Sequence, residues 1–155
     1  MRSVLLALLP AGLLASCGPE IPEYPPEPSI RFVRFAQPGT DSLQVTLHFI
    51  DGDGDLGVPE ENPDPNLFFY FYHRDPAGNW TPTDGPSQLV TDTLVYTYRV
   101  PELPVSQDKV AEGDITVTMD KRFIPNDTIS LDMRLHDRAG NRSLWVRTPE
   151  VILTR

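Results

Sequence analysis

Three carboxylates alternate with glycines in the stretch Asp51-Gly52-Asp53-Gly54-Asp55-Leu56-Gly57, directly after a run of alternating apolar residues. Ca²⁺ binds six to eight oxygen ligands, and aspartates separated by glycine allow a tight loop to wrap around an ion. Three like charges so close together also repel one another, and a bound cation removes that repulsion. We therefore predict a calcium loop with Asp51, Asp53 and Asp55 as ligands. The alternative is an Asp/Gly-rich turn whose side chains cap their own backbone and bind nothing.

The spacing in this loop differs from that of an EF-hand. An EF-hand loop has glycine at its sixth position and a bidentate glutamate at its twelfth. Those positions are Leu56 and Asn62 in this chain, and Gly57 comes one residue late. The flanking segments also alternate in the manner of strands, whereas an EF-hand needs helices. The sequence thus predicts a calcium loop between strands.

The composition of the chain limits the classes of partner. The formal net charge is −9, with 22 acidic and 13 basic residues among 155. An acidic domain repels phosphate backbones and attracts cations and basic protein surfaces. We therefore exclude nucleic acid as a partner. The sequence also contains no G-x-S-x-G motif, no phosphate loop and no nucleophile with a paired base, so we expect no enzymatic activity.

Short segments with period-two alternation, separated by turn residues, predict an all-β fold. The clearest is Leu43–Phe49, in which apolar residues alternate with polar ones. Similar segments and their turns give seven or eight strands, which indicates a β-sandwich occupying residues 29–155. The other expected strands are Ile30–Phe35, Leu67–Tyr72, Leu94–Val100, Ile115–Met119, Ile129–Leu135 and a segment from Leu144 to Leu153 interrupted by Pro149, with a short return strand at Trp80–Pro82.

The amino-terminal segment resembles a bacterial lipoprotein signal. An apolar run too short to span a bilayer is followed by Leu14-Ala15-Ser16-Cys17, which matches a lipobox. The resemblance implies removal of residues 1–16 and acylation of Cys17, for example by palmitate. Residues 17–28 are rich in proline and predict a semi-rigid tether. Gly18 after the cysteine fits export to the outer membrane, and the periplasmic and cell-surface faces both stay open.

A second motif, Asp137-Arg138-Ala139-Gly140-Asn141-Arg142-Ser143, resembles the D-x-A-G-N-x-S turn near the end of many bacterial immunoglobulin-like domains. Together with the Asp51–Gly57 loop and the lipobox, it is similar to a group of small Bacteroidota lipoproteins. This resemblance implies an immunoglobulin-like β-sandwich and a membrane location, and it implies no activity.

Strand direction decides whether the two motifs meet. In an immunoglobulin-like sandwich, the loop after the second strand and the loop before the last strand lie at the same end. Asp137 and Asn141 would then join the predicted metal ligands. A full extra strand at Trp80–Pro82 would add a reversal and separate the two loops. Alternatively, Asp137 and Asn141 fix only their own turn.

From these features we expect a lipid-anchored, non-catalytic binding or accessory protein in a cell-envelope complex, attached to the membrane through Cys17 and paired with an envelope protein. The alternative is a carbohydrate-binding module at the cell surface, because exposed aromatic rings stack on sugars. The aromatic residues concerned, which equally fit core and edge packing, are Phe69, Tyr70, Phe71, Tyr72, Trp80 and Trp145.

Overall fold

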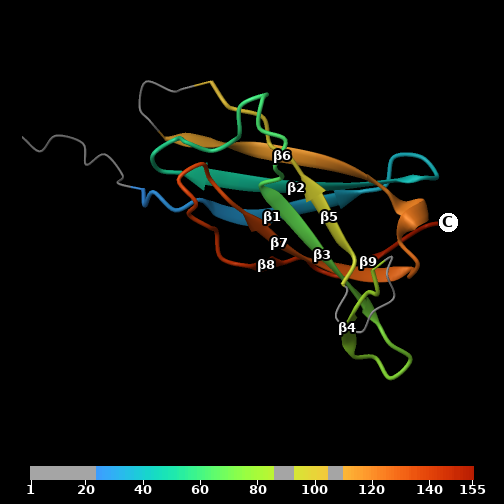
Figure 1. The fold of residues 1–155 in the computed structure, drawn as a ribbon. Helices are drawn as coiled ribbons and strands as arrows, with labels where there is room; N and C mark the ends of the chain where they lie inside the picture. Colours follow the sequence, from blue (N-terminus) through green and yellow to red (C-terminus); the bar gives the residue numbers. More distant parts are fainter. Residues whose placement is uncertain (1–23, 86–92, 105–109) are drawn as a thin grey trace, which may run out of the picture.

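The computed structural model describes residues 24–85, 93–104 and 110–155, so the predicted signal peptide and Cys17 lie outside the described residues. The described residues form nine strands and one short 3₁₀ turn, Lys121–Phe123. The strands make two antiparallel sheets that face each other (Figure 1). No helix in this part of the chain is long and apolar enough to cross a membrane.

The first sheet has three strands in the order β1-β2-β6. These strands are β1 (Ser29–Ala36), β2 (Ser42–Asp51) and β6 (Ala111–Asp120). β6 begins four residues before the predicted Ile115, because Ala111 to Asp114 continue the pairing with the end of β2. His48 of β2 holds this extension, since its two ring nitrogens contact the carboxylates of Asp114 and Glu112 at 2.8 and 3.2 Å.

The second sheet has β3 at its centre, paired along its length with β7. The strands of this sheet are β3 (Leu67–Arg74), β4 (Trp80–Pro82), β5 (Val95–Tyr98), β7 (Thr128–Leu135), β8 (Val146–Arg147) and β9 (Val151–Ile152). Both β8 and β9 pair with β7, and Pro149 lies between them, where the sequence predicted the interruption.

The core lies between the sheets and is made by one face of each. Alternate residues of β2 and β6 meet alternate residues of β3 and β7, because successive side chains of a strand point to opposite faces. The central members of this cluster, each 2 % exposed or less, are Leu43, Val45, Leu47, Val117, Phe69, Phe71, Leu131 and Met133. The predicted all-β sandwich is confirmed, and its strand order corresponds to the A-B-E and C-F-G sheets of immunoglobulin domains.

The short strand β4 does not separate the two motif loops. β4 and β5 both pair antiparallel with β3, β4 with residues 72–74 and β5 with residues 67–70. The two strands therefore run in the same direction and form one interrupted edge strand. Because β4 and β5 act as one strand, they add no extra change of chain direction. β2 and β7 therefore run in the same direction and finish at the same end of the sandwich (Figure 1).

The chain after the Asp51–Gly57 loop crosses the segment that follows β5 at very short range. Val58 forms a parallel bridge with Pro101, and the backbone N–H of Val58 donates to the carbonyl of Val100 at 3.0 Å. Gly57 has a φ of 88°, and a Cβ there would lie 2.2 Å from the carbonyl oxygen of Pro101. Gly78 has the same φ but open space around it.

We predict that Gly57→Ala destabilises the protein by roughly 3 kcal/mol or more, because it adds a backbone clash to an unfavourable φ. Gly78→Ala is the matched control and should cost only about 1–2 kcal/mol, the cost of the left-handed conformation alone. Urea unfolding of the two variants measures the difference. Equal losses of stability would contradict the close crossing at Pro101.

Candidate metal centre

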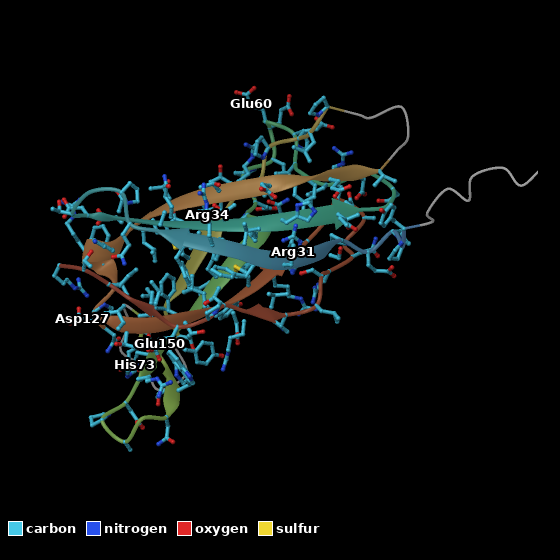
Figure 2. The ribbon with its side chains drawn as sticks, turned by 180° about the vertical axis from the view of Figure 1, so that it is seen from behind. Arg31, Arg34, Glu60, His73, Asp127 and Glu150 are labelled. Carbon is cyan, nitrogen blue, oxygen red and sulfur yellow. The ribbon has the colours of Figure 1, made fainter. Side chains whose placement is uncertain are left out.

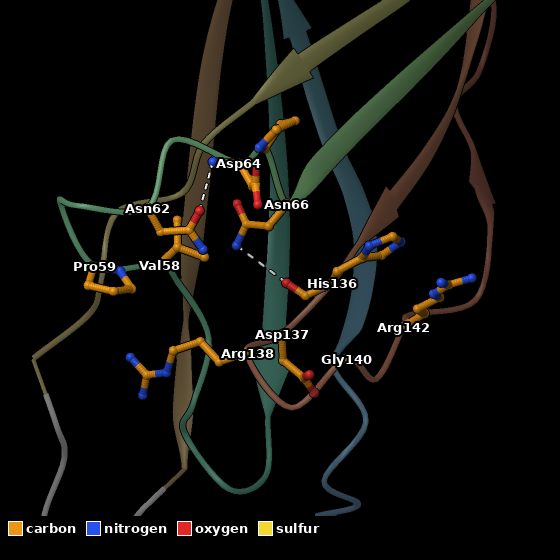
Figure 3. Close-up of a pocket in the computed structure, with 11 residues that line it drawn as sticks. Val58, Pro59, Asn62, Asp64, Asn66, His136, Asp137, Arg138, Gly140 and Arg142 are labelled. Atoms are coloured by element: carbon orange, nitrogen blue, oxygen red, sulfur yellow. Dashed lines mark hydrogen bonds between the residues drawn. The ribbon is translucent and has the colours of Figure 1, made fainter.

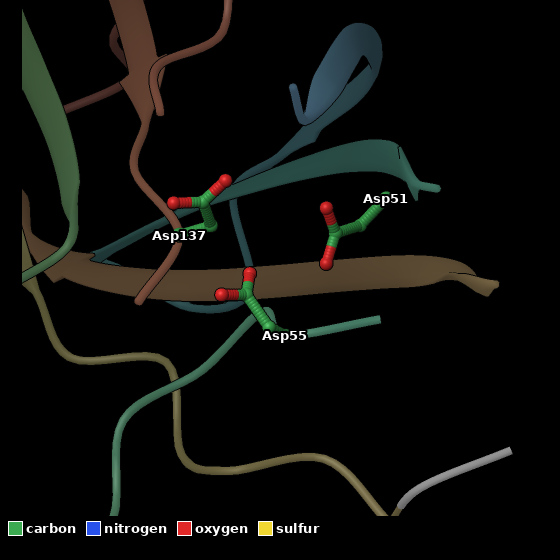
Figure 4. Close-up of side chains that lie close together, drawn as sticks. All are labelled: Asp51, Asp55 and Asp137. Atoms are coloured by element: carbon green, nitrogen blue, oxygen red, sulfur yellow. The ribbon is translucent and has the colours of Figure 1, made fainter. Parts of the chain in front are cut away.

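Three aspartates from two distant segments meet at the end of the sandwich where β2 and β7 finish. Asp51 is the last residue of β2, Asp55 lies in the loop that follows, and Asp137 follows β7. One carboxylate oxygen from each of the three lies within 4.8 Å of the other two (Figure 4). Asp51 is 0 % exposed and Asp137 is 6 % exposed. The structure therefore places Asp137 beside the predicted loop.

In each of the three carboxylates, one oxygen is hydrogen-bonded to the backbone and the other is not. One oxygen accepts a backbone N–H: from Leu56 to Asp51 at 2.8 Å, from Ala139 to Asp55 at 3.0 Å and from Asn141 to Asp137 at 2.7 Å. The other oxygen, Oδ1 of Asp51, Oδ1 of Asp55 and Oδ2 of Asp137, is buried without a hydrogen-bond partner. Backbone capping thus accounts for half of the available acceptor atoms, and the other half stays free for a ligand.

The electrostatics of the cluster disfavour three bare charges. Burial raises the pKa of Asp51 to about 6, although the N–H of Leu56 opposes the shift, and the charges of Asp53, Asp55 and Asp137 raise it further. Burial, followed by the charge of Asp137, also raises the pKa of Asp55. Without a cation, the site therefore takes up protons more readily than ordinary aspartates do.

The spacing of the three carboxylates fits one calcium ion. Two oxygens on a common Ca²⁺, each about 2.4 Å from it, can lie at most about 4.8 Å apart. The three carboxylates meet this limit. Because each already accepts one backbone N–H, they fit as single-oxygen ligands, which leaves further positions for backbone carbonyls or water. An oxygen-only donor set suits a hard cation such as Ca²⁺ rather than zinc.

The other two predicted ligands occupy different positions. Asp53 is exposed and lies outside the group of three, although its charge acts on Asp51 and Asp55. Asn141 donates its backbone N–H to Asp137, and its carbonyl accepts the N–H of Asp137 at 3.2 Å. Asp137 therefore fixes its own turn with one oxygen and offers the other to the cluster. Glu60, later in the loop, lies at the outer edge of the molecule (Figure 2).

Two residues that the sequence analysis did not single out hold the long loop in place. Arg99 donates from its guanidinium to the carbonyls of Asn62 at 2.8 Å, Pro59 at 2.7 Å and Val58 at 3.2 Å. Asn66 is buried, accepts the N–H of Val100 at 2.8 Å and donates to the carbonyl of His136 at 3.3 Å. The sequence holds one signal for Asn66, its place at the end of the turn-forming stretch Asn62-Pro63-Asp64-Pro65-Asn66. It holds none for Arg99, which is an ordinary polar position within the expected strand Leu94–Val100.

A cavity of about 430 Å³ opens beside the cluster, between the 51–66 loop and the 137–142 turn (Figure 3). Asp137 lines it together with polar groups that include Asn62, Asp64 and Asn66. Arg138 on the same wall forms an ion pair of 2.5 Å with Glu102. A cation held by Asp137 would therefore lie next to a polar cavity, whose walls are the two segments that the cation joins.

The aromatic residues considered for sugar stacking separate into two groups. Phe69 and Phe71 are buried in the core, so they cannot stack on a ligand. Tyr70, Tyr72 and Trp145 line a hollow of about 450 Å³ on the outer face of the second sheet. Trp80, in β4, does not line this hollow, and the guanidinium of Arg74 lies 5.1 Å from the centre of its ring.

Comparisons of the chain with protein-family models, curated proteins and solved structures give no match.

We predict that the calcium-free protein becomes less stable to unfolding as pH rises from 5 to 7, and that Asp51 causes this loss. Because the folded pKa of Asp51 is raised, the folded protein binds more protons than the unfolded chain between about pH 4 and 6. This contribution to stability is complete below that window and is lost as pH rises through about 6. Between pH 5 and pH 7 the loss should be on the order of 1 kcal/mol.

Urea unfolding of wild type and Asp51→Asn in chelator at pH 5 and pH 7 measures this loss. The comparison needs the variant because burial lowers the pKa of His136, and a lowered histidine pKa makes stability rise with pH, opposite to the effect of Asp51. Wild type should gain stability relative to Asp51→Asn as pH falls. A constant difference between the two proteins would contradict the raised pKa.

Proposed function

We propose that the chain is a lipid-anchored, non-catalytic binding protein of the bacterial outer membrane, with a calcium ion that clamps one end of its sandwich. The observation that carries the calcium assignment is the trio of buried, unpartnered carboxylate oxygens of Asp51, Asp55 and Asp137. A buried charge without compensation costs several kcal/mol, and a cation at their centre supplies that compensation.

The clamp would act on the shape of the polar cavity. Asp51 and Asp55 belong to the loop on one side of the cation, and Asp137 belongs to the turn on the other side. In the described residues, the N–H of Ala139 donating to Asp55 is a direct bond between these two segments. Calcium would add bonds from both sides, so the cavity walls would be held in one arrangement that a partner can recognise.

The partner expected at this end is an envelope protein rather than a nucleic acid. The chain has a net charge of −9, which favours basic protein surfaces. Asp64 on the cavity wall and the exposed Asp53 and Glu60 nearby extend this acidic character to the loop itself. Recovery of one membrane protein with the chain after cross-linking in cells and mild detergent extraction would identify the partner.

We predict that calcium raises the unfolding midpoint of the purified protein relative to chelator, because a ligand that binds only the folded state stabilises it. At calcium concentrations of about 100 times the dissociation constant, the gain is about 2.7 kcal/mol. Asp51→Asn and Asp137→Asn should abolish most of this gain, because each replaces a carboxylate of the cluster. Thermal unfolding with and without calcium measures it.

Asp53→Asn is the matched control, because it removes a charge of the same loop whose side chain is exposed. This variant should keep most of the calcium-dependent gain. Equal midpoints with millimolar calcium and with chelator would refute the site, and a loss in Asp53→Asn as large as that in Asp51→Asn would refute the choice of ligands.

The anchor has a separate prediction. Cys17→Ser should release the protein from the membrane fraction, because acyl chains on this residue supply the attachment, at about 0.8 kcal/mol for each buried CH₂ group. Fractionation of cells that express wild type and variant measures the release. Unchanged attachment of the variant to the outer membrane would show that the anchor lies elsewhere.

A further inference from the structure

The chain that leads into the sandwich packs directly against the Asp51–Gly57 loop. A Cβ on Gly52 would lie 2.3 Å from the carbonyl oxygen of Pro25 and 2.5 Å from that of Tyr24. The described part of the chain therefore starts at the end of the sandwich that holds the carboxylate cluster. Figure 1 shows this segment, in blue, at the end where β2 finishes, with the carboxyl terminus at the other end.

An exposed apolar pair lies beside this incoming segment. Leu144 is 87 % exposed and Trp145 is 48 % exposed. Both line a hollow of about 440 Å³ together with Pro25, Pro28 and Arg142. The pair is therefore next to the tether, and water covers most of the Leu144 side chain in the isolated domain.

Two arginines lie beside Trp145, and the acidic residues Glu27 and Asp132 also line hollows that it borders. The guanidinium of Arg134 lies 5.0 Å from the centre of the Trp145 ring. Arg142 lines two hollows that Trp145 also borders, one of them together with Arg134. Within the described residues neither arginine forms an ion pair with an acidic side chain, whereas Arg147 nearby is paired with Asp132 at 2.7 Å. The Nε of Arg134 donates to the carbonyl of Ser143 at 3.3 Å, and the remaining N–H groups of Arg134 and those of Arg142 are available to bind phosphate.

The geometry of the aromatic rings disfavours a saccharide at this surface. The Tyr70 ring meets Trp145 edge-on, with centroids 5.1 Å apart and an interplanar angle of 83°. Arg134 covers one face of the indole. The two rings therefore do not form a flat platform, and the exposed aliphatic side chain of Leu144 offers a sugar no hydrogen bond. Tryptophan, leucine and arginine together are typical of a membrane–water interface.

The distance to the anchor restricts which surface can reach the bilayer. Six residues lie between Cys17 and Tyr24, and the seven steps from one to the other span at most roughly 25 Å whatever path they take. The sandwich is longer than this, because the ten residues of β2 alone extend over about 33 Å. Phe123, the other strongly exposed aromatic residue, lies in the 3₁₀ turn after β6 at the opposite end.

We propose that Arg134, Arg142, Leu144 and Trp145 form a bilayer-contact surface, with Leu144 and Trp145 in the headgroup region and the two arginines on lipid phosphates. This inference rests on the lipid anchor of the proposed function. It places the carboxylate cluster near the bilayer and leaves the β4 hairpin, which extends away from the incoming segment in Figure 1, in solvent.

The test uses the full lipidated protein in vesicles whose acyl chains carry bromine, a short-range quencher of tryptophan fluorescence. Trp80→Phe leaves Trp145 as the sole tryptophan, and Trp145→Phe leaves Trp80. We expect the emission of Trp145 to fall roughly twofold relative to unbrominated vesicles, as for an indole at the interface, and that of Trp80 to stay unchanged. In the Trp80→Phe background, Leu144→Ser and Arg142→Gln should weaken this quenching, whereas Phe123→Ala, at the opposite end, should not.

Flotation of the vesicles separates the possible failures. If the protein floats with the vesicles and Trp145 is quenched no more than Trp80, the contact surface is refuted and the anchor stands. If the protein does not float, the anchor is refuted and the inference falls with it. If maltoheptaose or chitohexaose changes Trp145 emission as strongly in detergent as brominated lipid does in vesicles, the surface binds saccharide, and the inference is likewise refuted.

Discussion

The buried negative charge at one end of the sandwich is the constraint on which the rest of this structure depends. Asp51 ends a core strand with no exposed surface, and Asp137 is nearly as deep. Carboxylates in such positions need hydrogen bonds or a counter-charge. The backbone supplies one N–H to each member of the cluster and leaves one oxygen of each without a partner. The described groups of the fold therefore satisfy only half of the carboxylate oxygens in this cluster, and the proposed cation would compensate the other half.

The three carboxylates meet because of strand direction rather than sequence proximity. β2 and β7 lie in different sheets, and they finish at the same end only if an even number of chain reversals lies between them. The chain makes four: from β2 to β3, from β3 to the β4–β5 edge, from that edge to β6, and from β6 to β7. The interruption between β4 and β5 preserves that count, because both run the same way along β3. A conventional hairpin at Trp80–Pro82 with its own return strand would have moved Asp137 to the far end. The edge of the second sheet thus determines whether the cluster exists at all.

The sequence predicted most of the fold because alternation along a strand directly reflects burial on one face, as Leu43 to Phe49 illustrate. It also predicted that Asp51, Asp55 and Asp137 could converge, from the general geometry of a sandwich. The exposed position of Asp53 could not be predicted, because side-chain direction in a glycine-rich loop depends on backbone angles that the residue types leave free. The role of Arg99 in holding the loop could not be predicted from the sequence either. Arg99 donates to three backbone carbonyls, and only the folded loop determines where those carbonyls lie.

The close packing of the incoming chain on Gly52 connects the carboxylate cluster to the anchor. Gly52 follows Asp51 directly, and its missing side chain is what lets the carbonyls of Tyr24 and Pro25 approach the loop. A rigid loop therefore holds the backbone of Tyr24 and Pro25 in one position, whereas a mobile loop does not. If a cation holds Asp51 and Asp55 against Asp137, it also fixes the direction in which the chain leaves the sandwich. The same ion would then set the shape of the polar cavity on one side and the angle of the domain to its tether on the other.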